Sequence, residues 1–437
     1  MYASAIGKIF LDEYNRYNQT NYSAKDYFTD EFLKLFFDHE KYMMKGGNSP
    51  LDNPKIKRGT FPDQAERSER IGKTIDLIES KPESSSAIGY PSADLTATTS
   101  GQVSSLKLPI TPENVYLSWI GGGLGVGVNG GLAFYIQDAQ ILMDIFSGWQ
   151  FYRRWLNETS VLKGNQIETW NGQWLAHYYD PDIFDYSSGP STGESLKGDK
   201  NRLELKTQQW VKILLRASQK YPNKTILTYV FSLGQTNKTL GFLPVYLPEI
   251  LRPIELYKKY FGKNQFLKDT KEIENIFGNN YGLYKACETG SIGIKALEPK
   301  ALRDYMPRGK NIIPIYPDKQ KEKITFRTYL VWVSAMLNNE KLINQAEKAA
   351  QIFLNYNLET LRGKTKEKRF IDELLKSPNP RKFIDGLTEI INQSSAEVAD
   401  DLNSLVIELN KMPRENFAYF TTLIRFKYAY LNRKEQS

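Results

Sequence analysis

The stretch YLSWIGGGLGVGVNGG, from Tyr116 to Gly131, decides the fold. It holds seven of the chain's 30 glycines, and an apolar run leads into them. Glycine permits positive φ angles and lets another backbone or a ligand approach closely. We predict strands at 115–119 and 132–136 on either side of a glycine loop, and a long amphipathic helix that starts near Gln137. The glycines therefore mark a place where main chain meets main chain or a ligand.

Gly125, Gly127 and Gly130 satisfy the pattern GxGxxG, which is also a dinucleotide-binding signature. That signature requires a helix that begins at the glycines within a compact βαβ unit. Here the expected helix begins only after a second strand, and no lysine follows the glycines to meet a phosphate. A nucleotide-binding enzyme that uses this loop stays an alternative. A tight turn with a purely structural role and a loop that approaches nucleic acid are the others.

The chain has 437 residues, which is more than a single hydrophobic core usually supports, so we expect two domains or three. Lys and Arg outnumber Asp and Glu by 58 to 50, and the pI is near 9.0. This excess favours an anionic partner such as nucleic acid. The sequence shows no apolar run long enough to cross a membrane and no signal peptide at its start. We therefore expect a cytoplasmic protein that has no membrane partner.

Few residues are suited to catalysis or metal binding. One cysteine, Cys287, and two histidines, His39 and His177, make an internal disulfide impossible and a structural zinc site implausible. Cys287 is far from both histidines in sequence, so we interpret it as a buried structural thiol. The acidic cluster YYDPDIFDY at 178–186 is more typical of a solvated turn than of a cation site. We expect no catalytic residue, no metal and no cofactor.

The N-terminal part is predicted to be helical. Ser23 and Asp26 have the spacing of a capping box, and apolar residues follow at helical spacing in a helix that should stop at Gly46. From about 50 to 110 the sequence turns polar and rich in Ser, Thr, Gly and Pro, which predicts a flexible insertion. The start of this insertion carries the basic residues Lys55, Lys57 and Arg58.

Two further segments follow the glycine loop. Apolar residues from 141 to 156 lie on one helical face, with Arg153 at its edge and Arg154 pointing away from it. Residues 225–248 are predicted to form two strands joined by a polar tip, which is the pattern of a β-hairpin. The glycine-punctuated segment 278–293 is predicted to be irregular.

The last part of the chain, from about residue 320, has apolar residues at helical spacing in several blocks, with prolines at the boundaries. It predicts a bundle of four or five helices. The expected fold class is α+β. A mixed N-terminal domain at 1–319, with short antiparallel strands and helices, is followed by a C-terminal α-helical bundle at 320–437.

Several strings resemble the large subunit of type I CRISPR Cascade complexes, in the branch found in type I-B systems. They are SAKDYFTDEFLKLFFDHEKYMMKGGNSP from Ser23, the glycine stretch, SGWQFYRRWL and WNGQWL. Together they cover about the first 180 residues, while the central hairpin and the terminal bundle agree in architecture. Some relatives carry paired CxxC motifs for zinc. This chain departs from that pattern because it has a single cysteine.

The resemblance implies a subunit without nuclease activity. Such a subunit recognises the protospacer-adjacent motif in double-stranded DNA, assists duplex opening and R-loop stabilisation, and docks the helicase-nuclease, while base pairing to the guide reads the target sequence. The implied partners are the guide crRNA ribonucleoprotein, target double-stranded DNA, the Cascade backbone and foot subunits, the small subunit, and a helicase-nuclease or a transposon adaptor. A scaffold protein without a nucleic-acid role is a further alternative.

The family reads its motif from the minor groove, with a glycine-rich loop, a lysine and a glutamine-bearing hairpin wedge. That groove is only about 6 Å wide, so backbone without side chains fits it best. The resemblance assigns the loop role to 121–131, namely Gly122, Gly123, Gly125 and Gly127, with Asn129 as the polar reader. It assigns the wedge role to Gln235 with Asn237 and Lys238, and the alternative wedge is GNQ at 164–166. Phosphate contacts are assigned to Arg153, Arg154, Lys55, Lys57 and Arg58.

Overall fold

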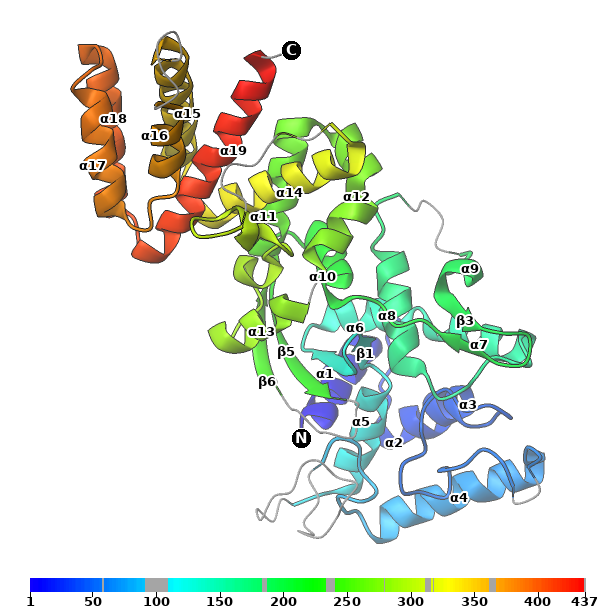
Figure 1. The fold of residues 1–437 in the computed structure, drawn as a ribbon. Helices are drawn as coiled ribbons and strands as arrows, with labels where there is room; N and C mark the ends of the chain where they lie inside the picture. The colour runs from blue at the N-terminus through cyan, green and yellow to red at the C-terminus, as the bar shows by residue number, and fades with distance from the viewer. Residues whose placement is uncertain are drawn as a thin grey trace. The chain divides into compact units, whose positions relative to one another are not determined.

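The computed structural model describes residues 1–56, 59–90, 109–182, 187–232, 240–278, 280–310, 316, 318–360 and 367–435. The chain divides into two compact units, Met1–Leu247 and Pro248–Ser437, which we call unit 1 and unit 2. Figure 1 follows the chain from its N-terminus in blue to its C-terminus in red.

Unit 1 combines helices with two antiparallel sheets. Its helices are α1 Tyr2–Asn18, α2 Ala24–Tyr27, α3 Leu33–Phe36, α4 Gln64–Ser80, α5 Pro112–Gly122, α6 Ala139–Phe146, α7 Trp149–Glu158, α8 Ile167–Tyr178, α9 Thr192–Ser195 and α10 Trp210–Lys220. Its strands are β1 Val126–Val128, β2 Leu132–Ile136, β3 Leu196–Gly198, β4 Leu203–Leu205, β5 Thr225–Ser232 and β6 Gly241–Tyr246. One turn of π-helix, Phe28–Phe32, joins α2 to α3.

The larger sheet has the strand order β1-β2-β5-β6, and each neighbouring pair is antiparallel. The register pairs Leu132 of β2 with Ser232 of β5, and Val230 of β5 with Gly241 of β6. The smaller sheet pairs β3 with β4. Together with the helical unit 2, these sheets confirm the expected α+β class. The predicted strand at 132–136 and the predicted hairpin at 225–248 are both present.

The capping box at the second helix is confirmed. The Ser23 hydroxyl accepts a hydrogen bond from the backbone of Asp26, and the Asp26 carboxylate accepts one from the backbone of Ser23. The helical run that follows ends at Phe36, because Phe37 leaves the helical conformation with φ −129°. The expectation that this helix continues to Gly46 is therefore wrong.

The predicted strand at 115–119 is also wrong, because this segment forms α5. Thr111 caps the helix by accepting a hydrogen bond from the backbone of Asn114, and Pro112 occupies the first turn, where its missing N–H costs nothing. Every residue from Val115 to Gly122 is buried. A helix buried all round lacks the polar positions that distinguish a helical period from a strand.

The helices α1 and α5 cross at two glycines. A Cβ atom on Gly7 would lie 2.0 Å from the carbonyl oxygen of Leu117, and one on Gly121 would lie 1.9 Å from the carbonyl oxygen of Ala3. No side chain fits at either position, so the two backbones are in direct contact (Figure 1). Here main chain meets main chain, as the glycine content predicts.

The long helix expected from Gln137 is broken in two at Ser147 and Gly148, between α6 and α7. A Cβ on Gly148 would lie 2.3 Å from the indole of Trp174, which fills the space at the break. The Trp174 Nε1 donates to the carbonyl oxygen of Asp144 at 2.8 Å and so binds the last turn of α6. The break between α6 and α7 therefore makes room for Trp174 of α8.

The expected flexible insertion at 50–110 contains a helix, α4. Asp63 and Glu66 form a capping box at its start, and Thr74 and Ile78 are buried. Residues 57, 58 and 91–108 of the insertion, which include Lys57 and Arg58, lie outside the described residues.

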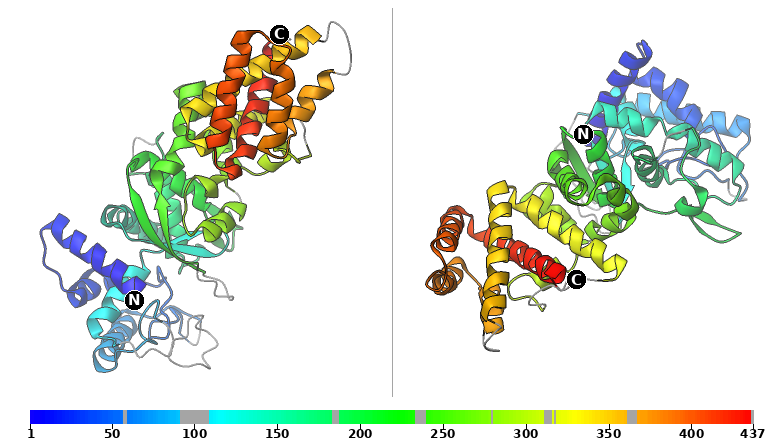
Figure 2. Two further views of the ribbon diagram at one scale, coloured as in Figure 1. Left: turned by 90° about the vertical axis from the view of Figure 1, so that its left-hand side faces the viewer. Right: turned by 90° about the horizontal axis from the view of Figure 1, so that it is seen from above.

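Unit 2 is helical. Its elements are α12 Lys263–Phe277, α13 Asn280–Thr289, α14 Gln320–Leu337, α15 Glu340–Thr360, α16 Glu367–Leu375, α17 Pro380–Ile391, α18 Ala396–Lys411, α19 Phe417–Glu435 and three 3-10 turns, Ile294–Leu297, Leu302–Tyr305 and Arg414–Asn416. The helix α11, Leu247–Phe261, leads into it. From residue 318 the described part of the chain forms six α-helices, α14 to α19, rather than four or five. Figure 2 shows α15 to α18 side by side in orange tones.

The boundary between the units falls after Leu247 rather than at residue 319. The segment before α14 packs on the bundle: Trp332 Nε1 donates to the carbonyl of Ile294 at 3.0 Å, and the Tyr329 hydroxyl donates to the carbonyl of Lys300 at 2.6 Å. These contacts join 294–305 to the helices that follow, so the bundle forms one unit with the residues before it.

Two further expectations in unit 2 are wrong. The segment 278–293, expected to be irregular, contains α13. Cys287, expected to be buried, is exposed. Partial desolvation raises the pKa of its thiol, which disfavours the nucleophilic thiolate. Among the described residues, no helix is long and apolar enough to span a membrane.

The crossing of α1 and α5 makes a prediction about stability. We expect Gly121→Ala to lower the free energy of unfolding by about 1–3 kcal/mol or more, because the added methyl group forces two packed backbones apart. Gly72→Ala is the matched control, because Gly72 lies inside α4 and a Cβ there meets nothing within 4 Å. It should stabilise by about 0.5–1 kcal/mol. Urea denaturation followed by circular dichroism measures the free energy of unfolding of both variants. Equal effects of the two substitutions would contradict the close backbone contact between α1 and α5.

Candidate nucleic-acid interface

Four of the glycines assigned to the loop role are buried. A Cβ on Gly122 would lie 2.9 Å from the Ile88 side chain, one on Gly123 would lie 3.1 Å from the Phe32 ring, and one on Gly125 would lie 2.9 Å from the Tyr135 ring. These glycines make room for neighbouring side chains of unit 1.

Gly127, the fourth, lies in β1 against α8. A Cβ there would lie 3.0 Å from the backbone of Glu168, and a Cβ on Gly172 would lie 2.6 Å from the Gly127 carbonyl oxygen. Asn171 of α8 is buried, and its Nδ2 donates at 2.8 Å to the carbonyl oxygens of both Gly123 and Gly125. Protein therefore occupies the space around these four glycines. The expectation that their bare backbone enters a DNA groove is corrected accordingly.

The exposed part of the glycine stretch is the turn between β1 and β2, at Asn129, Gly130 and Gly131. The two glycines have φ angles of 89° and 69°, which L side chains rarely adopt, and a Cβ on either would meet nothing within 4 Å. The described part of the chain gives the Asn129 side chain no hydrogen-bond partner, so its amide is available at the surface.

The turn is held at its base by the segment before α10. The Asn129 N–H donates to the carbonyl oxygen of Gln208 at 2.9 Å, and Val128 and Gln208 form a parallel bridge. Two amide side chains extend this contact: Gln208 Nε2 donates to Gln173 Oε1 at 2.9 Å, and Gln173 Nε2 donates to the carbonyl of Lys206 at 2.5 Å. Sequence reasoning missed Gln173 and Gln208, and the only local signal is the pair of glutamines before Trp210.

The register of the large sheet brings the end of β5 to the same place. Leu132, the first residue of β2, pairs with Ser232, the last residue of β5. The Asn129 turn therefore precedes β2 at the end of the sheet where β5 finishes. Gln235, Asn237 and Lys238 follow β5 in sequence, but they lie in 233–239, outside the described residues.

The alternative wedge at 164–166 is tied to the protein. The Asn165 N–H donates to the carbonyl oxygen of Tyr42 at 2.8 Å, and a Cβ on Gly164 would lie 2.7 Å from the same oxygen. The Gln166 Oε1 accepts a hydrogen bond from the backbone of Leu205 at 3.2 Å. Insertion of this segment between base pairs would break these contacts.

The two adjacent arginines have different surroundings. Arg153 is buried, and its guanidinium donates to the carbonyl oxygen of Lys41 at 2.6 Å and to Asn157 Oδ1 at 3.3 Å. Burial lowers the pKa of Arg153 to about 10. Its expected phosphate contact is corrected to a structural role. Arg154 is exposed and lies over the Phe151 ring, 4.9 Å from its centroid, so it stays a candidate for phosphate contact.

Lys55 is exposed as well, with its ammonium 5.6 Å from the centroid of the Phe61 ring. An exposed cation over a ring keeps most of its hydration and is open to an anion. Lys55 therefore stays a candidate for phosphate contact, together with Arg154.

His39 lies in the region of Arg153. Burial lowers its pKa to about 4, with a further contribution from the positive charge of Arg153, while Asp38 acts in the opposite direction. Asp38 pairs with Arg67 at 3.0 Å. His39 is therefore neutral near pH 7, and the region gains no charge from it.

The geometry differs from that of a dinucleotide site. The helix that follows the glycines, α6, begins at Ala139 after β2, so the glycines do not lead directly into a helix as a dinucleotide fingerprint requires. Among the described residues, no group of three or more His, Cys, Asp and Glu side chains is placed to hold a metal ion. In the acidic cluster at 178–186, the carboxylate of Asp180 pairs with Arg216 at 2.5 Å.

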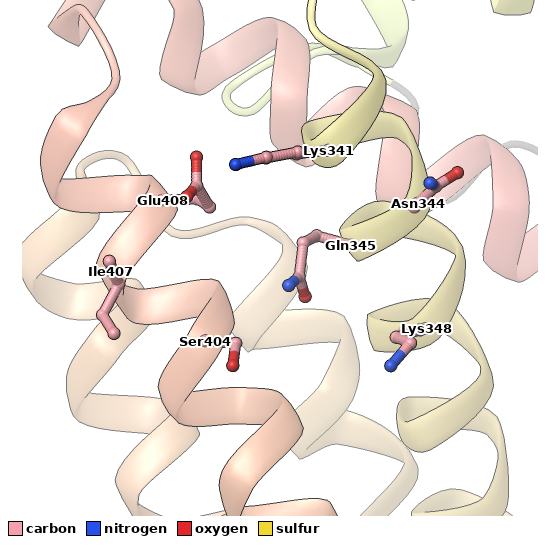
Figure 3. A pocket seen from close by; sticks show the side chains of 7 residues that line it. All are labelled: Lys341, Asn344, Gln345, Lys348, Ser404, Ile407 and Glu408. Carbon is pink, nitrogen blue, oxygen red and sulfur yellow. The ribbon is translucent and has the colours of Figure 1, made fainter.

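Unit 2 has a shallow groove between α15 and α18, and no predicted site residue is part of its lining. Figure 3 shows its lining, which is formed by Lys341, Asn344, Gln345, Lys348, Ser404, Ile407 and Glu408. Lys348 pairs with Asp401 at 2.7 Å, so one of its two cations already has a partner.

No family model matches the chain, and no similar curated protein or solved structure is found.

The arginine pair makes a prediction. Arg153→Met should lower the free energy of unfolding by about 2 kcal/mol, because it removes the charged donor of a part-buried hydrogen bond to the Lys41 carbonyl. Arg154→Met, the matched control on the next residue, should change it by no more than about 0.5 kcal/mol. Urea denaturation measures the free energy of unfolding of both variants. Equal values would show that Arg153 is a surface residue.

The surroundings of His39 make a prediction about pH. The pKa of His39 is about 4 in the folded protein and near 6.5 in an unfolded chain, so the unfolded state binds the proton first as the pH falls. Stability is therefore fully present above pH 6.5 and decreases towards pH 4. His39→Gln should make the free energy of unfolding less dependent on pH in this window. An unchanged pH profile would show that His39 is solvated.

Proposed function

We propose that this protein is the nuclease-free large subunit of a type I, I-B-like, CRISPR Cascade surveillance complex. In this role it recognises the protospacer-adjacent motif in target double-stranded DNA. It then assists duplex opening, stabilises the R-loop and docks the helicase-nuclease or, in a transposition system, a transposon adaptor.

The identity in this proposal comes from the resemblance of the N-terminal strings, and one structural observation supports it: the register of the large sheet. Pairing of Leu132 with Ser232 sets the Asn129 turn at the sheet end where β5 leads into the segment that contains Gln235. Motif recognition needs a polar reader, and duplex opening needs a wedge beside it. The Asn129 turn would supply the reader at this end of the sheet, and the residues that follow β5 in sequence would supply the wedge.

The Asn129 turn has the chemistry for reading a minor groove. An amide offers both a donor and an acceptor, and the two glycines after it add no bulk to a groove about 6 Å wide. Gln173 and Gln208 support the turn from behind, so the reader is held by hydrogen bonds. Gln235, with Asn237 and Lys238, would act as the wedge that enters the duplex. Unstacking one base step in this way costs a few kcal/mol, which the new contacts must offset.

Charge is divided unevenly between the two units. Unit 1 has 26 Lys and Arg and 26 Asp and Glu, whereas unit 2 has 32 and 24. The whole net charge of +8 therefore resides in unit 2. We assign the sequence-independent attraction to phosphates mainly to unit 2, with Arg154 and Lys55 as contacts from unit 1.

The proposed partners follow from this role. They are the guide crRNA ribonucleoprotein, target double-stranded DNA, the backbone and foot subunits of Cascade, and the small subunit. The complex would work in the cytoplasm, where the target DNA is found.

The proposal is tested by plasmid interference across a library of randomised adjacent motifs. Asn129→Ala should lower interference about tenfold or change the preferred motif, because loss of one base contact costs about 1–3 kcal/mol. Gln235→Ala should lower interference for every motif, because a wedge has no base preference. Asn201→Ala is the matched control, since Asn201 is exposed in the turn between β3 and β4.

Three outcomes would count against the proposal. If both variants keep the interference and motif preference of the wild type, the site assignment is wrong. If Asn201→Ala has the same effect as Asn129→Ala, the effect is not specific to the turn. Tight, saturable binding of NAD or ATP would favour the nucleotide-binding alternative.

A further inference from the structure

The exposed turn between β1 and β2 contains a dipeptide with a chemistry of its own. Asparagine followed by glycine occurs twice in the chain, as Asn129–Gly130 and as Asn171–Gly172. In such a pair the glycine nitrogen can attack the side-chain carbonyl carbon of the asparagine, because glycine has no side chain that hinders the approach. The two pairs are identical in sequence, so any difference in their reactivity comes from the fold.

The reacting groups of the pair in the turn are unrestrained. Asn129 and Gly130 are exposed, and a Cβ atom on Gly130 would meet nothing within 4 Å. Among the residues that the structure describes, none forms a hydrogen bond with the Asn129 side chain or with the Gly130 N–H. The Asn129 side-chain carbonyl, which is the electrophile, and the Gly130 nitrogen, which is the nucleophile, are therefore both available for reaction.

The fold blocks the same reaction at the second pair. Asn171 is buried, and its Nδ2 donates at 2.8 Å to the carbonyl oxygens of Gly123 and Gly125. Gly172 lies inside α8, where its N–H belongs to the helical ladder, and a Cβ there would lie 2.6 Å from the Gly127 carbonyl oxygen. Both reacting groups are thus engaged in hydrogen bonds and closely packed.

We propose that Asn129 is a site of spontaneous deamidation. The Gly130 nitrogen loses its proton to solvent and bonds to the Asn129 Cγ, and the side-chain nitrogen leaves as ammonia, so a succinimide ring forms. Water then adds to either ring carbonyl and opens the ring, which gives aspartate or isoaspartate at position 129. The overall reaction consumes one water and releases one ammonia. Asparagine counts among the thermolabile residues, and this reaction needs no further reagent.

Either product changes the chemistry of the turn. The Asn129 amide both donates and accepts hydrogen bonds, whereas a carboxylate only accepts them and carries a negative charge. Isoaspartate also inserts one methylene into the main chain of the turn. The modification does not depend on the proposed function, but its consequence for motif reading rests on it. In that role the modified turn would lose its donor and repel the DNA phosphates, so motif recognition would decline as the protein ages.

The test follows the full-length protein over time by peptide mass spectrometry. Trypsin places the two pairs in different peptides, because it cleaves after Arg153 and Lys163, and conversion of an amide to an acid raises the mass of the affected peptide. Asn129 should convert about tenfold faster than Asn171 or more, since the Asn171 side chain must first break two hydrogen bonds. The rate at Asn129 should rise with pH, because the attacking nitrogen must lose its proton.

Two controls isolate the fold as the cause of the difference. In urea, where neither pair is held, Asn129 and Asn171 should convert at similar rates. The variant Asn129→Gln should stay intact in the folded protein, because its longer side chain would have to close a larger ring. Equal rates at the two pairs in the folded protein would overturn the inference. Conversion of Asn129 in urea but not in the folded protein would overturn it as well.

The outcomes separate this inference from the proposed function. If Asn129 stays intact in the folded protein, the inference fails, while Asn129→Ala can still change the preferred motif in the interference assay. If Asn129 converts and Asn129→Asp keeps the motif preference of the wild type, the modification stands and motif reading by Asn129 is wrong. Conversion of Asn129 together with lowered interference in Asn129→Asp supports both.

Discussion

The structure of unit 1 depends on backbones that approach more closely than any side chain permits. The α1–α5 crossing has this property at Gly7 and Gly121, and β1 has it where Gly127 lies against α8. Such contact leaves no room for water, so the polar backbone groups need partners inside the protein. Asn171 supplies them with two hydrogen bonds to carbonyls between α5 and β1. The glycine stretch therefore anchors three helices and a strand, and its exposed turn at 129–131 stands on a rigid base.

Local sequence patterns predict the fold where one side of an element meets water. The capping box at Ser23 and the paired strands β5 and β6 follow from spacing and alternation. The strand at 132–136 is buried throughout, and it is predicted instead by a short apolar run directly after the glycine turn. The α5 segment is not predicted in either way, because it is buried all round and has no polar side to mark its period. A signal for it exists in Thr111, Pro112 and Asn114, which together cap a helix start. That signal lies outside the apolar run and is easily passed over.

A residue of the candidate site can be predicted from the sequence only where its position depends on its neighbours along the chain. Asn129 lies between two apolar runs, and such a residue belongs to a turn whatever the rest of the fold does. Burial of Arg153 depends instead on the carbonyl of Lys41, which is distant in sequence. The hydrogen bond from the Asn129 N–H to the Gln208 carbonyl is likewise a contact between residues distant in sequence. Spacing within one helix or loop carries no information about either contact. From the sequence alone, the adjacent Arg153 and Arg154 therefore look like a basic patch.

The uneven division of net charge between the two units has a kinetic consequence under the proposed function. Unit 1 has no net charge, so attraction to phosphates alone holds DNA only weakly at the Asn129 turn. A motif reader with strong phosphate contacts would leave wrong sites slowly, because each such contact slows dissociation equally at every sequence. Because the positive excess lies in unit 2, unit 2 attracts DNA, while residues of unit 1 select the motif. Dissociation from a wrong motif then depends on a few hydrogen bonds, which is what rapid search requires.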